Sequence, residues 1–230
     1  GRYLGEVGVK LTWGTRCAEI GYCFRSSSWG HGYAVEAAAA MIDWIVGEYA
    51  PTRIWGALHP DNLASAQVLE RLGMRFEGHT RNSYWVGDDN SDDWIYGMTP
   101  DELVTWRHRP RAAPATVEVV PVTVHNATAA RRLVTHKSQE RFVAPMLYSF
   151  AEAMYPEPEE DYDVVPVLRV VLADGDVVGF VMYADVARGQ EHPYLWRFLV
   201  DRRHQRRGIG RRALHALYDE LRAAGATAVD

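Results

Sequence analysis

The chain of 230 residues has few cysteines, no excess of positive charge and no long apolar run, and each shortage excludes a class of protein. Its two cysteines, Cys17 and Cys23, have no CxxC spacing, so we expect no disulfide framework and a reducing, cytoplasmic setting. The net charge of −5 argues against a nucleic-acid partner, because such a partner needs a basic surface. No apolar run reaches the roughly 20 residues that span a bilayer, so we expect no membrane association. The histidines lack the spacing of metal ligands, and we expect no metal.

A segment rich in proline, alanine and arginine divides the chain. Residues 107–116 (RHRPRAAPAT) have no hydrophobic period, which is typical of a linker. They separate a first domain, residues 1–106, from a second domain, residues 117–230. Strand-like and helix-like stretches are mixed in both halves, and this mixture predicts an α/β or α+β domain on each side of the linker.

The hydrophobic patterns predict the secondary structure of each half. In the first domain we expect strands at 5–13, 18–24 and 53–59, helices at 34–50 and 62–73, and a hairpin at 83–99. Asn62 is a suitable N-cap for the second helix, and Gly73 is a suitable C-cap. In the second domain we expect strands at 117–123 and 194–201, helical stretches at 129–142 and 149–155, a hairpin at 167–186, a helix at 211–225 and the beginning of a strand at 226–230.

Each half contains a strand, then a polar loop with two glycines, then a helix. The glycines are Gly30 and Gly32 in the first half and Gly208 and Gly210 in the second, so aligning the pairs relates the halves by 178 positions, the difference between 210 and 32. Glycine lets a backbone approach a phosphate closely, and the unpaired N–H groups at a helix start attract an anion. Arginines beside the second loop suit further phosphates; they are Arg206, Arg207, Arg211 and Arg212. A plain strand-to-helix turn is the alternative interpretation of either glycine pair.

The residues around these glycines resemble the GNAT superfamily of acyltransferases. Gln205 to Gly210 matches the pattern Q/R-x-x-G-x-G/A, which is the acetyl-CoA loop of that superfamily. The stretches EIGYCF, WGHGYA and HPDNLASAQVLERLG of the first half resemble the branch of ribosomal-protein N-terminal acetyltransferases, with Ser27 at the Gln/Arg position of the motif. The second half, through VVGFVMY, LWRFLVD and its loop, resembles the diamine (spermine/spermidine) acetyltransferases.

The resemblance implies two GNAT-like units in tandem, each a twisted mixed sheet flanked by helices, with acetyl-CoA as the co-substrate. It also implies that the opening strand and helices of the first unit, and the closing strand, helix and hairpin of the second, lie outside this sequence. The coenzyme-binding residues that it implies in the first unit are Phe24, Ser28, Trp29, Gly30, His31, Gly32, Tyr33 and Asn62. Those that it implies in the second unit are Leu199, Val200, Gln205, Arg206, Arg207, Gly208, Ile209 and Gly210.

The resemblance further implies an N-acetyltransferase that moves an acetyl group to a primary amine: a protein N-terminus, a polyamine or a small amine. Glu19, on the strand before the first loop, is the candidate base that accepts the amine proton through water, and an exposed strand glutamate without a role is the alternative. Ser65 is the candidate proton donor to the leaving thiolate, because Leu69 stands where many GNAT enzymes have a tyrosine; simple helix packing is the alternative. Under the glycine alignment Arg197 matches Glu19, so the two units would not share one catalytic plan.

The acceptor, the partners and the activity of each unit have alternatives. An acidic run could border a cleft for a polyamine or form a solvated loop; its members are Glu157, Glu159, Glu160, Asp161 and Asp163. A homodimer is compatible with the sequence. The alternative function is an acyl-CoA-binding regulatory or degenerate module without turnover in one or both units.

Overall fold

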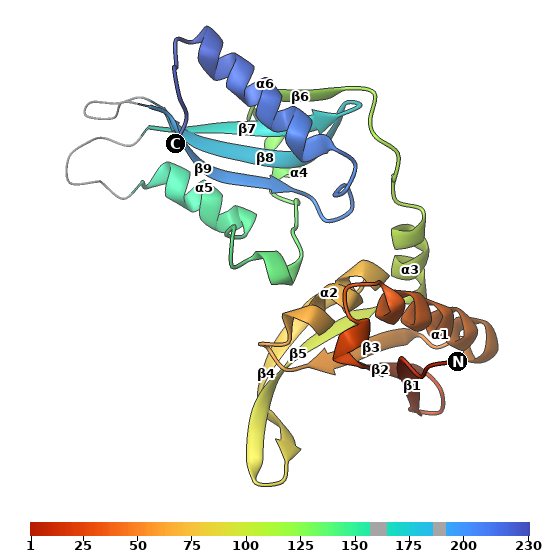
Figure 1. The fold of residues 1–230 in the computed structure, drawn as a ribbon. Coiled ribbons are helices and arrows are strands. Elements are labelled where there is room, and N and C mark those ends of the chain that lie inside the picture. The colour runs from red at the N-terminus through yellow and green to blue at the C-terminus, as the bar shows by residue number, and fades with distance from the viewer. Residues whose placement is uncertain (157–164, 186–191) are drawn as a thin grey trace. The chain divides into compact units, whose positions relative to one another are not determined.

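The structure, a computed structural model, describes residues 1–156, 165–185 and 192–230 and has two compact units, each with its own sheet (Figure 1). Unit 1 consists of Gly1–His108 together with His136–Ser138. Unit 2 consists of the described residues of Arg109–Thr135 and Gln139–Asp230. The acidic run at 157–163 lies outside the described residues.

Unit 1 is built on a mixed five-stranded sheet with the order β1-β2-β3-β5-β4. Its elements are β1 (Gly5–Thr12), β2 (Cys17–Phe24), the 3-10 helix η1 (Ser26–Ser28), α1 (Tyr33–Tyr49), β3 (Arg53–Leu58), α2 (Leu63–Leu72), β4 (Arg75–Val86), β5 (Asp89–Met98) and α3 (Pro100–Arg107). Only the β2–β3 pair is parallel, and the other neighbours are antiparallel. A mixed sheet flanked by helices is therefore confirmed for this half of the chain.

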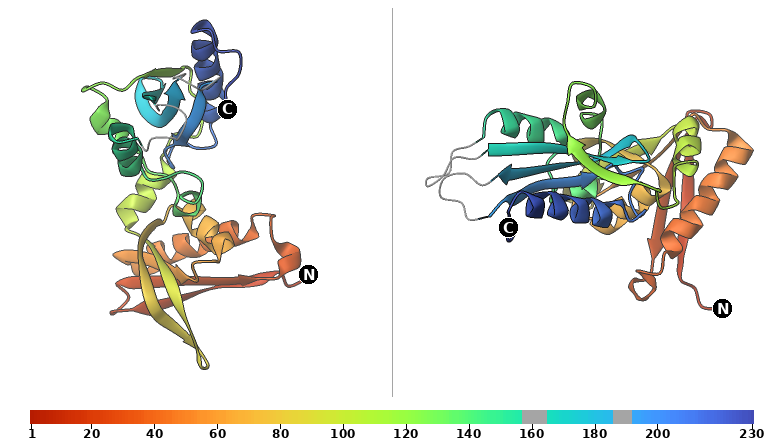
Figure 2. Two further views of the ribbon diagram at one scale, coloured as in Figure 1. Left: turned by 90° about the vertical axis from the view of Figure 1, so that its left-hand side faces the viewer. Right: turned by 90° about the horizontal axis from the view of Figure 1, so that it is seen from above.

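The helices α1 and α2 cover one face of this sheet (Figure 2, left). Side chains of β2 alternate between the two faces, and Ala18, Ile20 and Tyr22 pack in the same core as Ile42 of α1 and Leu69 of α2. Ala18, Ile42 and Leu69 are all at most 2% exposed. Glu19, between two of these core residues, therefore lies on the face that α1 and α2 do not cover.

The caps of α2 are the ones predicted. The side-chain oxygen of Asn62 accepts a hydrogen bond from the Ser65 N–H at 3.1 Å, and Gly73 follows the helix with φ +105°. The helix α3 was not predicted, although Thr99 and Glu102 form a capping box around it, with Pro100 at its first turn. This signal is readable in the sequence as TPDE.

Unit 2 has a four-stranded sheet among its described residues, with the order β6-β7-β8-β9 and antiparallel neighbours throughout. Its elements are β6 (Val117–Pro121), α4 (Ala127–Ala130), the end of the 3-10 helix η2 (Lys137–Gln139), α5 (Met146–Met154), β7 (Val165–Ala173), β8 (Asp176–Asp185), β9 (Tyr194–Val200) and α6 (Ile209–Ala223). The helices α5 and α6 cover opposite faces of the sheet (Figure 2, right). The apolar stripe of α6 has a spacing of four residues and is buried; it consists of Ile209, Ala213, Leu217 and Leu221.

The long helical stretch predicted at 129–142 is wrong. Only α4 and η2 are helical there, because tertiary contacts hold the chain between them in another conformation. The Val134 N–H donates to the Asp201 carboxylate at 3.1 Å, and the Val134 carbonyl accepts from the Arg202 N–H at 2.8 Å. Leu133 is buried in the core beneath α5. These contacts outweigh a local helix preference that is weak at the β-branched pair Val134 and Thr135.

The strand predicted at 226–230 is present only as a single bridge. The Asp230 N–H donates to the Pro193 carbonyl at 3.0 Å, and the Asp230 carbonyl accepts from the Leu195 N–H at 2.8 Å. Two bonds from one residue to the neighbours of Tyr194 are the pattern of a parallel ladder. Unit 2 therefore has one parallel contact beside its antiparallel strands.

Part of the predicted linker is held within unit 2 by two arginines. Arg207 Nε donates to the carbonyl of Ala112 at 2.7 Å. Arg212 donates to the carbonyls of Pro114 and Ala115 at 2.6 and 2.8 Å. Both guanidinium groups thus bind backbone oxygens of residues 112–115, in addition to any contact with the phosphates for which the sequence makes them suitable.

We expect Arg212→Ala to release this segment. The variant loses two charge-assisted hydrogen bonds, and cleavage by trypsin after Arg111 should become about 10-fold faster, because opening the segment becomes easier. Arg211→Ala is the matched control, since Arg211 is the exposed neighbour on the same helix and also a trypsin site. Mass spectrometry would follow the cleavage. Equal cleavage rates in the two variants would contradict the inference that Arg212 holds residues 112–115 in place.

Candidate functional site

Two neighbouring parallel strands of unit 1 separate halfway along their length. The pairing of β2 with β3 ends at Glu19 and Trp55, although β2 continues to Phe24 and β3 to Leu58. The helices α1 and α2 follow these two strands, so both helix starts lie at the edge where the strands have separated. Ligands of α/β proteins bind at this kind of edge, beyond the carboxyl ends of parallel strands.

Backbone groups of β2 point into this separation. The Arg25 N–H donates to the Leu4 carbonyl at 2.9 Å, so the odd-numbered residues of β2 exchange their hydrogen bonds with β1. The N–H and C=O groups of the even-numbered residues Tyr22 and Phe24 therefore point toward β3, past the last paired position. The Tyr22 and Phe24 N–H groups are suitable donors to a developing negative charge there.

The loop between β2 and α1 is shaped by left-handed glycines. Gly30 has φ +78°, and Gly32, the N-cap of α1, has φ +85°. Only glycine adopts these angles without strain. A Cβ atom added at either glycine would meet no other atom within 4 Å, so the loop surface is open at both positions.

The amide groups of this loop divide into two sets. The Ser28 and Trp29 N–H groups donate to the Arg25 and Ser26 carbonyls at 2.8 and 3.1 Å. In the described part of the chain, no hydrogen-bond acceptor is found for the backbone N–H groups of residues 30–33. With the partial positive charge at the start of α1, these open amides form a cradle for an anionic oxygen.

The loop between β9 and α6 has the same backbone conformation, but at a different register from the one predicted. Gly208 is the N-cap of α6 with φ +76°, and Arg206 has φ +63°, so they match Gly32 and Gly30. The shift between the units is thus 176 positions, the difference between 208 and 32, in place of the predicted 178. The alignment of the glycine pairs was wrong because Gly210 needs no left-handed φ angle. Gly210 lies inside α6 and matches Ala34 of α1.

The hydrogen bonds of the two loops follow this register. The bond from Ser28 N–H to the Arg25 carbonyl recurs between His204 and Asp201, with 2.8 Å in both loops. The first helical hydrogen bonds also agree. The Glu36 backbone N–H donates to the Gly32 carbonyl at 3.0 Å, and the Arg212 backbone N–H donates to the Gly208 carbonyl at 3.3 Å.

Two sequence-based assignments change with the register. Trp29, and not Ser27, occupies the Gln/Arg position of the motif, where unit 2 has Gln205. Before the loop, a bulge in β9 changes the shift by one position, because Arg197 pairs with Met182 and Leu195 with Tyr183; Tyr194, and not Arg197, therefore occupies the ladder position of Glu19. Arg197 instead pairs with Glu152 of α5 at 2.9 Å, on the opposite side of the sheet from α6.

The predicted residues of α2 lie at the start of the helix. Ser65 is half-buried in its first turn, and its carbonyl accepts a hydrogen bond from the Tyr22 hydroxyl at 3.0 Å. Burial raises the pKa of Tyr22 to about 12, so its hydroxyl keeps the proton that it donates. Tyr22 thereby ties the start of α2 to β2. It was not among the predicted site residues, although it belongs to the EIGYCF stretch.

Some predicted coenzyme residues are less open than expected. Ser28 is only 6% exposed and its N–H is already used, and Leu199 is 4% exposed within the core beneath α5. The side chains of these two residues therefore face the protein interior. Leu69, at the position where a tyrosine was sought, is 2% exposed and packs in the core.

A buried carboxylate that was not predicted shapes the loop of unit 2. Asp201 is 1% exposed, and its carboxylate accepts hydrogen bonds from the backbone and the guanidinium of Arg203, both at 3.0 Å. Arg207 Nη1 donates to His204 Nδ1 at 2.9 Å. Burial lowers the pKa of His204, and the neutral imidazole that this favours is the form that can accept.

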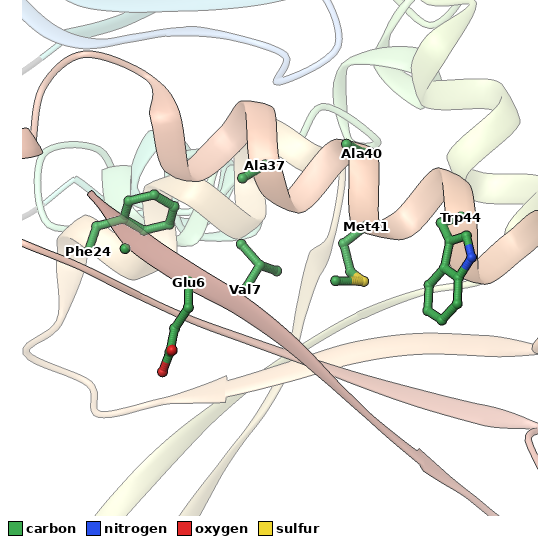
Figure 3. Close-up of a pocket in the computed structure, with 8 residues that line it drawn as sticks. Glu6, Val7, Phe24, Ala37, Ala40, Met41 and Trp44 are labelled. Atoms are coloured by element: carbon green, nitrogen blue, oxygen red, sulfur yellow. The ribbon is translucent and has the colours of Figure 1, made fainter. Parts of the chain in front are cut away.

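An open apolar groove of about 610 Å³ lies between β1 and α1 (Figure 3). Its apolar lining consists of Val7, Phe24, Ala37, Ala40, Met41 and Trp44. The Phe24 ring contributes to this groove, whereas its backbone borders the loop between β2 and α1. A coenzyme contact from Phe24 would thus come from the main chain.

No helix in the described part of the chain is long and apolar enough to cross a membrane. Within the same residues, no cluster of three or more histidine, cysteine or acidic side chains could hold a metal ion.

Both halves of the chain match family models of acetyltransferases. Residues 1–75 match the model described as acetyltransferase (GNAT) domain, and residues 132–230 match the acetyltransferase (GNAT) family. Among curated proteins, the uncharacterized N-acetyltransferase YnaD of Bacillus subtilis is 29% identical over 99 residues, which are 43% of this chain and 58% of YnaD. The uncharacterized protein YkkB of the same organism is 36% identical over 78 residues, which are 33% of this chain and 45% of YkkB.

Solved structures include Mycobacterium smegmatis RimJ, with 31% identity, a TM-score of 0.42, and coverage of 45% of this chain and 50% of RimJ. The chain thus spans about half the length of the relatives that it matches. The two family models together cover most of the chain, and they match its two loop-bearing halves separately. The chain therefore belongs to the GNAT acetyltransferase superfamily and carries a domain of that superfamily in each half.

Proposed function

We propose that this protein is an acetyl-CoA-dependent N-acetyltransferase that moves an acetyl group to a primary amine. The observation that supports this most directly is the strand–loop–helix cradle, which occurs twice with the same backbone conformation in a chain of the GNAT superfamily. In each cradle a left-handed glycine begins a helix, and the helix start presents open amides. A pyrophosphate needs such a site, because its oxygens take several backbone donors at once.

The separation of β2 and β3 suggests where the acyl group would lie in unit 1. With the pyrophosphate at residues 30–33, the pantetheine arm would extend between the strands toward Glu19. The thioester oxygen would accept hydrogen bonds from backbone N–H groups of β2 that point into this space. Asn62 and Ser65, at the start of α2, would border the thiol end.

Transfer requires a neutral amine. An alkylamine with a pKa near 10.4 costs about 4–5 kcal/mol to deprotonate at pH 7. Glu19 would take this proton through a water molecule, and the amine nitrogen would then attack the thioester carbon. The carbon–sulfur bond breaks, the amide forms, and the thiolate takes a proton, for which Ser65 is the candidate donor. The position of Glu19, where the strands begin to separate, supports this role.

A second candidate function applies to unit 2 alone: coenzyme binding without turnover. Tyr194 occupies the ladder position of Glu19 in this unit, and a neutral phenol accepts a proton far less readily than a carboxylate. Unit 2 would then hold acetyl-CoA or CoA as a structural or regulatory ligand, while unit 1 carries the reaction.

The acceptor class comes from the same proposal. A protein N-terminus, a polyamine and a small amine all present the primary amine that the reaction needs. RimJ, the neighbour with CoA-disulfide bound, does not decide among them for this chain. A panel of peptides, spermidine and simple alkylamines, with release of free thiol as the readout, would identify the acceptor.

Calorimetric titration of acetyl-CoA into the full-length natural protein is the test of the proposed function. We expect saturable binding with one or two sites per chain. The stoichiometry gives the number of loops that bind acetyl-CoA. A folded protein that binds no acetyl-CoA would refute the coenzyme assignment for both loops.

A further inference from the structure

We infer that Trp29 is a positioning residue of the unit 1 loop and that it takes over the role that Gln205 has in unit 2. Its indole Nε1 donates a hydrogen bond to the Phe24 carbonyl at 2.8 Å. Gln205 Nε2 donates to the Val200 carbonyl at 3.0 Å. Both pairs are separated by five residues, and the shift of 176 positions brings one pair onto the other. The assignment of acetyl-CoA to the loop rests on the proposed function. The hydrogen-bond geometry of the two loops does not depend on that proposal.

The two carbonyls need such a donor because, among the described residues, no neighbouring strand pairs with either of them. Phe24 C=O points toward β3, beyond the last paired position of β2. Val200 C=O points away from β8, because the next residue, Asp201, donates to the Val178 carbonyl at 2.8 Å. A backbone carbonyl without a partner is costly, and a side-chain N–H from the following loop satisfies it. The same bond fixes how the chain leaves the strand.

The exposure of Trp29 indicates that its N–H, more than its ring, matters to the fold. The residue is 63% exposed, so burial of the indole contributes little. Its backbone is also engaged: the N–H donates to the Ser26 carbonyl at 3.1 Å, and the C=O accepts from His31 Nδ1 at 2.7 Å. Three polar groups of one residue thus hold the loop, and they leave the amides of residues 30–33 open.

An indole suits the surroundings in unit 1. The side-chain amide of Gln205 has an oxygen and a second N–H besides the bond to Val200, and Gln139 exchanges hydrogen bonds with this amide at 2.9 and 3.4 Å. Trp29 has one N–H and no acceptor, so a single bond satisfies it and no partner like Gln139 is required.

The test compares Trp29→Phe, which keeps an aromatic ring but removes the N–H, with Trp29→Gln, which restores an amide donor. Trp13→Phe is the matched control, because Trp13 is 82% exposed at the turn between β1 and β2. The first readout is amide hydrogen exchange of peptides covering residues 25–36 without coenzyme. We expect about 10-fold faster exchange in Trp29→Phe, recovery to within about 3-fold in Trp29→Gln, and no change in Trp13→Phe. A purely hydrophobic role would be kept by phenylalanine and lost with glutamine.

The second readout is acetyl-CoA affinity in a Gly208→Glu background, which isolates unit 1. We expect about 10-fold weaker binding in Trp29→Phe and recovery in Trp29→Gln. Wild-type exchange in Trp29→Phe, or no recovery in Trp29→Gln, would overturn the inference. The expected exchange pattern in a protein that binds no acetyl-CoA would refute the proposed function but support the positioning role, so the two failures are distinguishable.

Discussion

Gly32→Glu and Gly208→Glu should each remove one acetyl-CoA site from the chain. Both glycines are helix N-caps with left-handed φ, and the space beside each is open. A side chain there would strain the backbone, occupy the place of the pyrophosphate, and bring a carboxylate against it. We expect each unit's affinity to fall at least about 100-fold, equivalent to about 2.7 kcal/mol. Titration calorimetry would then report one site fewer.

Matched controls separate this effect from backbone strain alone. Gly14 and Gly175 also have left-handed φ, +62° and +88°, and the same open surroundings, but they lie in strand–strand turns. Gly14→Glu and Gly175→Glu carry the same strain and charge, and they should keep full stoichiometry. Gly210→Ala should bind normally, because a Cβ there would be 3.6 Å from the Phe198 ring, an ordinary contact. Unchanged binding in Gly32→Glu would exclude the first loop as a coenzyme site.

The sequence predicted the helices and strands of each unit better than it predicted which residues of the two loops are equivalent. Periodic apolar residues and caps placed α1, α2 and α6 to within about two residues, because these signals act locally. The predicted register between the loops was wrong because it aligned glycine residues. What the two loops share is a left-handed backbone conformation, which a residue other than glycine can also adopt. In unit 2 the left-handed angle of Gly30 falls on Arg206, a residue that gives no sign of it.

The remaining misses came from contacts between distant residues. Nothing near Val134 indicates that Asp201 will bind its N–H, yet that bond ends the predicted helix. Similarly, the hydrogen bonds of Arg207 and Arg212 to residues 112–115 join segments about 95 positions apart. The sequence does not reveal that Trp29 is equivalent to Gln205, because the two side chains differ chemically. Their equivalence is that each donates a hydrogen bond to the carbonyl five residues earlier.

Glu19→Gln should abolish most of the acetyl transfer while leaving acetyl-CoA binding intact. The amide is nearly isosteric but cannot accept the amine proton, and loss of a general base costs typically 10²–10⁴-fold in rate, as an order of magnitude. Glu19 is half-buried and opposite Lys10 of β1, so a change of charge there should cost fold stability at most about 1 kcal/mol. Steady-state rates with a saturating amine, together with titration of acetyl-CoA, measure the two effects separately.

The pH dependence distinguishes a general base from a residue that only shapes the site. As the pH rises toward the pKa of the amine, free amine forms without help, so the deficit of Glu19→Gln should shrink between pH 7 and about pH 10. A deficit caused by distorted geometry would stay constant over this range. Glu6→Gln is the control, because Glu6 lies on the same face of the sheet, on β1 opposite Cys23. Equal losses in Glu6→Gln and Glu19→Gln would indicate that the charge of this face matters, and would remove Glu19 from the proton transfer.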